Sequence, residues 1–352
     1  MGIVNSIHGG NIYKIKRSHK KTIIDFSANI NPLGFSSAVK DALHKKISSL
    51  LHYPDAEYEA PRRAIAKHWN IKKENILIGN GSVELIYLIM NAFKPSSTLI
   101  PVPTFSEYER AARMINSKMH FLKLREKDNF KLNIAGVKDA DIYFFCNPNN
   151  PTGNIILEDY QAVEKLAGRL VVIDEAFLDF LPDERKYSFI QKAVVSEKII
   201  VLRSLTKFFA LPGLRIGYLV AHKNIIQKLK PFCSPWNVNS IAQIVAPIII
   251  NDKNYKEKTR KMIKVEKDYL CSELSTLKSL FCYSSVTNFL LLKIMNKKIN
   301  SSFLTRKLLQ KGILIRDCTN FRGLNDRFIR IAVRSHKENT MLIKLLKEIC
   351  KN

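Results

Sequence analysis

The chain has 352 residues, of which 46% are hydrophobic, and its formal net charge is +26. This length and apolar content predict about two domains with sizeable cores and exclude a fibrous or low-complexity protein. Lysine and arginine number 57 against 31 acidic residues, but the densest basic cluster, 14–21, has no interleaved aromatics and no recognition-helix pattern after it. We therefore expect no nucleic-acid partner, and attribute the charge to a lysine-rich composition or to attraction of anionic small molecules.

Targeting signals and paired cysteines are missing from the sequence. The first residues lack the apolar run of a signal peptide, and the apolar run 244–250 is far shorter than the ~20 residues that span a bilayer. Six cysteines are scattered along the chain without a C-x-x-C pair, which argues against a disulfide framework and predicts no metal site. We expect a cytoplasmic protein with free thiols and no membrane partner.

Short apolar strands alternate with amphipathic helices through the middle of the chain. The stretch up to residue 35 has too few periodic residues for a domain, and we expect it to pack as an arm. The predicted strands are 75–79, 98–102, 141–146, 170–174, 199–203 and 216–220, with a helix from Ser82. This alternation predicts an α/β domain with a largely parallel sheet, and strands rich in Ile and Val suit burial on both faces.

The pattern changes near residue 251. It continues as a long charged helix over 255–277, strands near Leu280 and Phe289, a helix from Ser302, strands at Ile313 and Phe328, and a final helix from Lys337. This succession predicts a smaller α+β domain. The predicted division is an N-terminal arm (1–35), a large domain (36–248) and a small C-terminal domain (249–352).

The segment 204–218 carries the strongest chemical signal. Lys207 follows a predicted strand, with Ser204 before it and Arg215 after it. A lysine amine that is partly buried near other cations can lose its proton and form a Schiff base with an aldehyde. Ser204 and Arg215 are suited to bind a phosphate on the same molecule. The grouping predicts that Lys207 holds pyridoxal 5'-phosphate (PLP). The alternative is that the segment is an ordinary basic surface loop.

Other motifs fit the same cofactor, although each alone could be a turn, a helix cap or a core side chain. Asp174 ends a predicted strand, where its carboxylate can keep a pyridine nitrogen protonated. Asn150 follows another strand and can donate to the cofactor's phenolic oxygen. Gly81 and Ser82 open a helix whose first amides favour an anion, and Phe105 is expected to stack on the pyridine ring.

In this order, these motifs resemble those of the fold type I PLP enzymes of the class I/II aminotransferase family, over nearly the whole chain. The resemblance implies a large domain with a mixed, mostly parallel seven-stranded sheet, a small α+β C-terminal domain, and a homodimer with active sites at the subunit interface. It also implies that Tyr53, in the run 52–55, reaches the phosphate of the neighbouring subunit's cofactor.

Finer features are similar to the threonine-phosphate decarboxylases of this family. They are the run His8-Gly9-Gly10-Asn11 and the segments 25–34 and 315–324. The similarity implies a phosphoamino acid substrate, whose anionic groups would contact His8, Asn31, Asn150, Arg316 and Arg330. Arg330 matches the family's carboxylate-binding arginine, and the planar guanidinium can bond a carboxylate or phosphate twice.

Phe177 departs from the pattern of many aminotransferases, which carry a tyrosine three residues after the ring-binding aspartate. The departure favours decarboxylation of L-threonine O-3-phosphate, which yields (R)-1-aminopropan-2-ol O-2-phosphate for cobalamin biosynthesis. Two other enzymes stay open, a 2-oxoglutarate-dependent histidinol-phosphate aminotransferase and a serine-phosphate decarboxylase, since one methyl group is worth only ~1–3 kcal/mol in a pocket. A regulator with an aminotransferase-like domain is disfavoured, because the match begins near His8 and leaves no room for an added DNA-binding domain.

Overall fold

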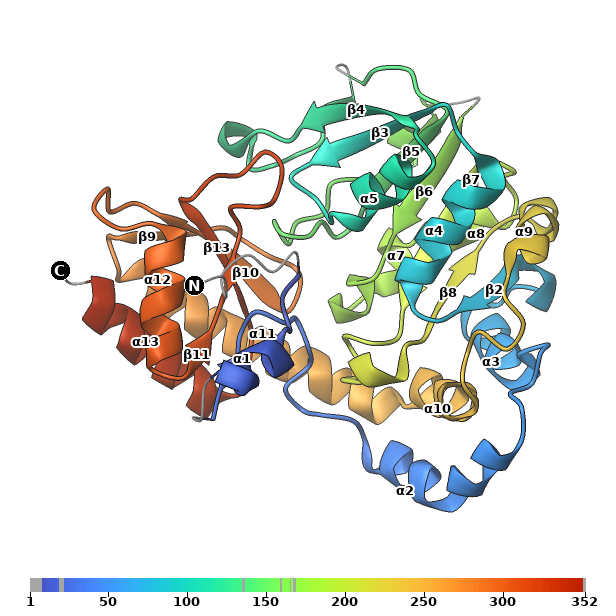
Figure 1. Ribbon diagram of the computed structural model, residues 1–352, viewed down its shortest axis with the longest axis horizontal. Coiled ribbons are helices and arrows are strands. Elements are labelled where there is room, and N and C mark those ends of the chain that lie inside the picture. Colours follow the sequence, from blue (N-terminus) through green and yellow to red (C-terminus); the bar gives the residue numbers. More distant parts are fainter. Residues whose placement is uncertain are drawn as a thin grey trace.

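The computed structural model describes residues 8–18, 22–134, 137–158, 160–164, 166 and 169–350. Its larger sheet has seven strands in the order β2-β8-β7-β6-β5-β3-β4 (Figure 1). β8 is antiparallel to both neighbours, and the other pairs are parallel. The strands are β2 (Ile76–Gly79), β3 (Ser97–Val102), β4 (Lys118–Lys123), β5 (Ile142–Cys146), β6 (Leu170–Asp174), β7 (Ile199–Ser204) and β8 (Gly217–Val220). The prediction of a mixed, mostly parallel seven-stranded sheet is confirmed.

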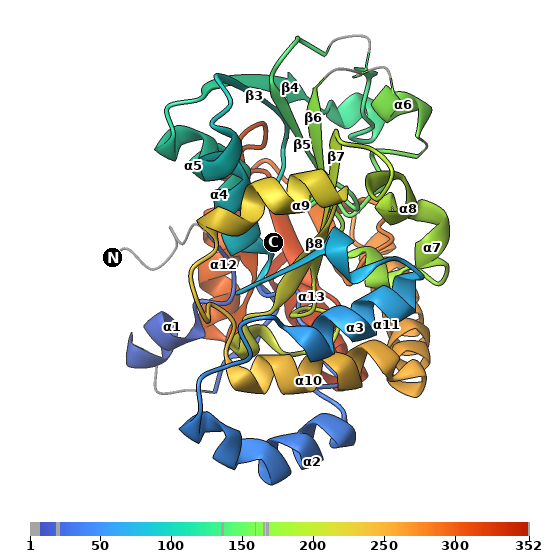
Figure 2. The same cartoon turned by 90° about the vertical axis from the view of Figure 1, so that its right-hand side faces the viewer.

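Side chains that alternate along the central strands belong to two separate cores. In β5, Ile142 and Phe144 lie in one core, and Tyr143 and Phe145 lie in the other. The first core includes α4 (Ser82–Phe93), α5 (Glu107–Met114) and α9 (Lys223–Leu229), and the second includes α3 (Glu59–Trp69), α8 (Ile190–Ala193) and α10 (Ser240–Asn251). Figure 2 shows helices on both sides of the sheet. Because both faces are covered, the central strands can be apolar throughout.

The strand β4 was not predicted. Its residues, Lys118–Lys123, are exposed or half-buried, because β4 is the edge strand and pairs with β3 alone in the order of this sheet. A strand of this kind lacks the continuous apolar run by which the central strands are recognised.

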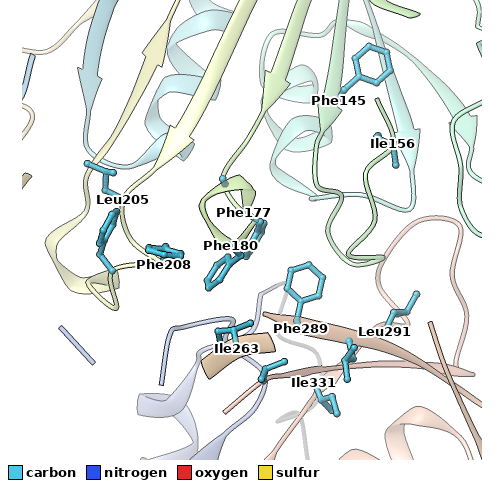
Figure 3. Close-up of a cluster of buried hydrophobic side chains, with 14 of the residues drawn as sticks. Phe145, Ile156, Phe177, Phe180, Leu205, Phe208, Ile263, Phe289, Leu291 and Ile331 are labelled. Atoms are coloured by element: carbon cyan, nitrogen blue, oxygen red, sulfur yellow. The ribbon is translucent and has the colours of Figure 1, made fainter. Parts of the chain in front are cut away.

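A second sheet of four antiparallel strands forms the smaller C-terminal part, in the order β12-β13-β10-β9. Its elements are β9 (Leu280–Cys282), β10 (Phe289–Ile294), β12 (Arg316–Asp317), β13 (Phe328–Ala332), α11 (Lys253–Ser275), α12 (Ser301–Gln310) and α13 (His336–Cys350). The two parts share a core, in which the rings of Phe177 and Phe289 meet edge to face at 5.0 Å (Figure 3). The predicted small α+β domain is confirmed.

The N-terminal segment is attached to this smaller part. β1 (Ile24–Asp25) pairs in parallel with β11 (Ile313–Leu314), and the backbone N–H of Ala332 donates to the carbonyl of Phe26 at 2.8 Å. α1 (Ile12–Ser18) precedes β1, and α2 (Ser37–Lys46) follows it. α10 crosses the predicted domain boundary at 248 and ends at Asn251. Two further short helices, α6 (Gln161–Glu164) and α7 (Glu184–Tyr187), lie in the large part. None of the helices in the described ranges is long and apolar enough to cross a membrane.

Candidate functional site

Most of the residues predicted to bind the cofactor follow the carboxyl ends of strands at one edge of the large sheet. Asp174 ends β6, where it is paired with Cys146 at the end of β5. Ser204 ends β7 and is paired with Gly217 at the start of β8. The turns that carry Phe105 and Asn150 follow β3 and β5. This edge is where sheets of this type bind ligands.

A cavity of about 190 Å³ lies beside this edge. The arm, the large part and the small part all contribute side chains to its lining. Among the predicted residues, those that line it are His8, Phe105, Asn150, Lys207, Arg316 and Arg330. Ser27, Phe177 and Phe321 line it as well and were not predicted as site residues. Folding therefore gathers an amine, two guanidinium groups and an imidazole around one space.

The amine of Lys207 is set up as a nucleophile. Its Nζ donates to Ser204 Oγ at 3.0 Å, and that oxygen lies 2.8 Å from Thr206 Oγ1. Burial lowers the pKa of Lys207, the Asp174 carboxylate opposes this, and Arg215 adds to it. An amine with a lowered pKa loses its proton more readily and can then attack a carbonyl carbon.

The carboxylate of Asp174 is buried and held at both oxygens. Oδ1 accepts from the backbone N–H of Ala176 at 3.0 Å, and Oδ2 accepts from the hydroxyl of Tyr108 at 2.7 Å. Burial raises the pKa of Asp174, while Lys207 and the Tyr108 hydrogen bond act in the opposite direction. Tyr108 stacks on Phe144 at 5.0 Å. Its contact with Asp174 was missed, because its position in the amphipathic helix α5 indicates only a core side chain.

An anion cradle forms where β2, β7 and β8 meet the start of α4. Gly81 has φ +84°, and a Cβ there would lie 2.6 Å from Nη2 of Arg215. A Cβ at Gly217 would lie 2.6 Å from the backbone nitrogen of Ser82. The positive φ of Gly81 and the close backbone approach at Gly217 require glycine, and they bring the first amides of α4, the guanidinium of Arg215 and the end of β7 at Ser204 together.

Arg330 is one of two buried arginines that line the cavity. Its Nη1 donates to Oδ1 of Asn150, its Nη2 donates to the carbonyl of Ser27 at 2.8 Å, and its guanidinium lies 5.2 Å from the ring centre of Phe289. Burial lowers the pKa of Arg330 to about 10. Its Nε is buried without a hydrogen-bond partner among the described residues. No carboxylate is among these contacts, so an anionic ligand would relieve the cost of burying this charge.

Arg316 is also buried in the cavity wall. It donates to the carbonyl of Asp317 at 2.8 Å and to Oδ1 of Asn320 at 2.7 Å. Burial lowers its pKa. Arg316 and His8 additionally line a smaller adjoining cavity of about 40 Å³, together with Lys14 of α1 and Thr305 of α12. Arg316 therefore stands between the cavity beside Lys207 and a second space next to the arm.

Asn31 and Tyr53 are not brought into this cavity. The side-chain amide of Asn31 donates to the carbonyl of Phe208, to Tyr255 Oη and to Thr259 Oγ1 at 2.8–3.0 Å. Because Tyr255 and Thr259 belong to α11, these hydrogen bonds attach the arm to α11, and the amide does not face the cavity. Its backbone N–H donates to the carbonyl of Lys207 at 3.1 Å. Tyr53 is 80% exposed and stacks on Trp236, so its predicted role depends on a second subunit.

These groups fit a flat phosphorylated pyridine aldehyde. Lys207 offers the amine, and the buried Asp174 carboxylate offers an acceptor for a protonated ring nitrogen. Phe105 provides an aromatic wall, and the glycine-lined cradle beside Arg215 is suited to a phosphate. PLP has all of these features.

Comparison with known proteins gives the same assignment. A threonine-phosphate decarboxylase from Salmonella typhimurium is 36% identical over 99% of this chain and 98% of its own. A histidinol-phosphate aminotransferase from Methanocaldococcus jannaschii is 32% identical over 93% of this chain and 89% of its own. The crystal structure of the histidinol-phosphate aminotransferase from Clostridium acetobutylicum, 33% identical, superposes with a TM-score of 0.86 over 93% of this chain and 99% of that chain. The family described as aminotransferase class I and II matches residues 21–347, and the chain belongs to this family, whose cofactor is PLP.

Proposed function

We propose that the chain catalyses the PLP-dependent decarboxylation of L-threonine O-3-phosphate to (R)-1-aminopropan-2-ol O-2-phosphate, a step of cobalamin biosynthesis, and that it acts as a homodimer. The observation that carries the proposal is the presence of two buried arginines, Arg316 and Arg330, in one cavity with the Lys207 amine. A phosphoamino acid brings one anionic group for each arginine. The similarity to a threonine-phosphate decarboxylase over nearly the full length of both chains supports this substrate.

In this proposal the cofactor is held by residues from every strand end at the site. Lys207 would hold its aldehyde group, Asp174 its ring nitrogen and Asn150 its phenolic oxygen, and Phe105 would stack on the ring. Its phosphate is held by Gly81, Ser82, Ser204 and Arg215, and by the partner subunit's Tyr53. When bound, PLP supplies an electron sink that stabilises negative charge at the substrate Cα.

We assign the substrate carboxylate to Arg330 and the phosphate to Arg316 and His8. Arg330 contacts Asn150, and this places Arg330 next to the cofactor's proposed position. Arg316 and His8 also line the smaller cavity next to α1, so they border both spaces. Two anchors at opposite ends of the substrate fix its rotation about Cα, and this rotation determines which bond is cleaved.

Phe177 favours decarboxylation over transamination in this arrangement. Its ring lines the cavity, packs on Phe289 and lies 5.6 Å from Nζ of Lys207, so it presents an apolar surface where many aminotransferases carry a hydroxyl. Lys207 lines the cavity, where its amine, once protonated, would return a proton to the substrate Cα. No keto-acid partner is then needed to complete the cycle.

Product analysis of the purified protein tests the proposal. With L-threonine O-3-phosphate and no 2-oxoglutarate, we expect carbon dioxide and aminopropanol phosphate in equal amounts, and L-serine O-phosphate in a parallel reaction measures the contribution of the methyl group. Histidinol-phosphate transamination is the second candidate, favoured by the similarity to the Clostridium acetobutylicum structure. Consumption of histidinol phosphate with 2-oxoglutarate, release of glutamate and no carbon dioxide would establish it instead.

A further inference from the structure

His8 is fixed beside the cavity through its backbone. A Cβ at Gly9 would lie 2.0 Å from the carbonyl oxygen of Ser27, so the close approach of the two segments requires glycine. Gly10 has φ +82° and donates its N–H to Oγ of Ser27 at 2.9 Å. The carbonyl of Ser27 also accepts from Arg330. The two glycines therefore set the position of His8 relative to Arg330.

The side chain of His8 is held by Glu107, the first residue of α5. Nε2 of His8 lies 2.6 Å from Oε1 of Glu107, which also accepts from Nη1 of Arg110 at 2.9 Å. Oε2 accepts from the hydroxyl of Tyr87 at 2.7 Å. Burial opposes the charge on Glu107, but the hydrogen bonds from His8, Tyr87 and Arg110 outweigh it and lower the pKa of Glu107 to about 2. An ionised carboxylate only accepts hydrogen bonds, so Nε2 of His8 carries a hydrogen.

We propose that Glu107 is a positioning residue that holds His8 in the orientation in which it binds the substrate's phosphate. His8 lines both the larger cavity and the smaller one, so Glu107 controls a side chain that faces substrate without lining the cavity beside Lys207 itself. The inference rests on the proposed function only in that the substrate carries a phosphate, which both candidate substrates do.

The test measures binding of inorganic phosphate to the PLP-loaded enzyme, independently of turnover. Glu107→Gln keeps the size of the side chain and removes its charge, and His8→Ala removes the group that it holds. Glu109→Gln is the matched control, because Glu109 lies on the same helix and pairs with Arg113 and Arg322. The visible absorption band of the bound cofactor reports that each variant is folded. If Glu107→Gln does not fold, Glu107→Asp, which keeps the charge but shortens the side chain, takes its place.

We expect the dissociation constant for phosphate to rise about tenfold or more in Glu107→Gln and in His8→Ala, as loss of one hydrogen bond to a charged group implies. The double variant should bind phosphate as weakly as His8→Ala and no more weakly, because Glu107 acts through His8. KM for the phosphorylated substrate should rise with kcat near its wild-type value, while Glu109→Gln leaves both unchanged.

Two results would overturn the inference. One is unchanged phosphate affinity in Glu107→Gln. The other is an equal loss when Glu107→Gln is introduced into the His8→Ala background, since a general structural role gives additive losses. If phosphate binding responds as expected but threonine phosphate is not decarboxylated, the proposed function fails and the role of Glu107 stands.

Discussion

Replacing Arg330 with Met should separate activity from stability. Burial lowers the pKa of Arg330 from 12.5 to about 10, which corresponds to about 3 kcal/mol against the charged form in the unliganded protein. Arg330→Met removes this charge and fills a similar volume, but it leaves Oδ1 of Asn150 and the carbonyl of Ser27 without their donor. Each lost donor costs about 1–3 kcal/mol, so the opposing effects should leave the free energy of unfolding between about 1 kcal/mol above and about 3 kcal/mol below that of wild type.

The same substitution should reduce kcat/KM by about 100-fold to 5,000-fold, because a buried anion without its partner costs about 3–5 kcal/mol. Urea unfolding with and without PLP, together with steady-state kinetics, measures both quantities. Arg327→Met is the matched control, since Arg327 donates to the carbonyls of Ile299, Ile294 and Asn296 and does not line the cavity. We expect this control to lose stability and keep kcat/KM. An Arg330→Met protein that unfolds easily yet keeps kcat/KM within tenfold of wild type would refute the reasoning.

Further predictions concern Lys207, Tyr108 and Arg316. Lys207→Ala should lose the visible band that borohydride bleaches in wild type and should not turn over, and a bleachable band in the variant would contradict the assignment. Burial lowers the pKa of Lys207, so just below pH 10.5 the unfolded apoprotein binds more protons than the native one. The free energy of unfolding of wild-type apoprotein, relative to that of Lys207→Met, should therefore rise as the pH approaches 10.5. A difference between the two proteins that does not change with pH in urea unfolding would count against this. Tyr108→Phe removes a hydrogen bond to a carboxylate worth about 1.5–3 kcal/mol and should raise the dissociation constant for PLP at least tenfold by absorbance titration, whereas unchanged binding would show that Tyr108 does not support Asp174. Arg316→Gln should raise KM for the phosphorylated substrate about tenfold or more while the cofactor spectrum stays as in wild type, and unaltered KM would remove Arg316 from the phosphate site.

The α/β fold and the places of Asp174 and Lys207 after neighbouring strands could be predicted, because they depend on local order along the chain. Asp174 ends an apolar strand and Lys207 follows another, so both reach the same edge once the sheet is parallel. Contacts between distant segments could not be predicted in this way. Tyr108 and Asp174 are 66 residues apart, and His8 and Glu107 are 99 apart, and nothing in either segment indicates its partner. For Asn31 the sequence indicated a contact with substrate, but in the structure its side-chain amide is hydrogen-bonded to Phe208, Tyr255 and Thr259.

The pairing of β1 with β11 has a consequence for the order in which the protein can assemble during synthesis. Ile24 and Asp25 leave the ribosome early, but their partners Ile313 and Leu314 follow only after the whole large sheet has been made. Until then the first strand has unpaired backbone donors, and the loop that must close is nearly as long as the chain. We expect the large sheet to form first and β11 to pair with β1 only afterwards. A ribosome-stalled fragment that ends before Ile313 should therefore leave β1 open to protease, and the full chain should protect it.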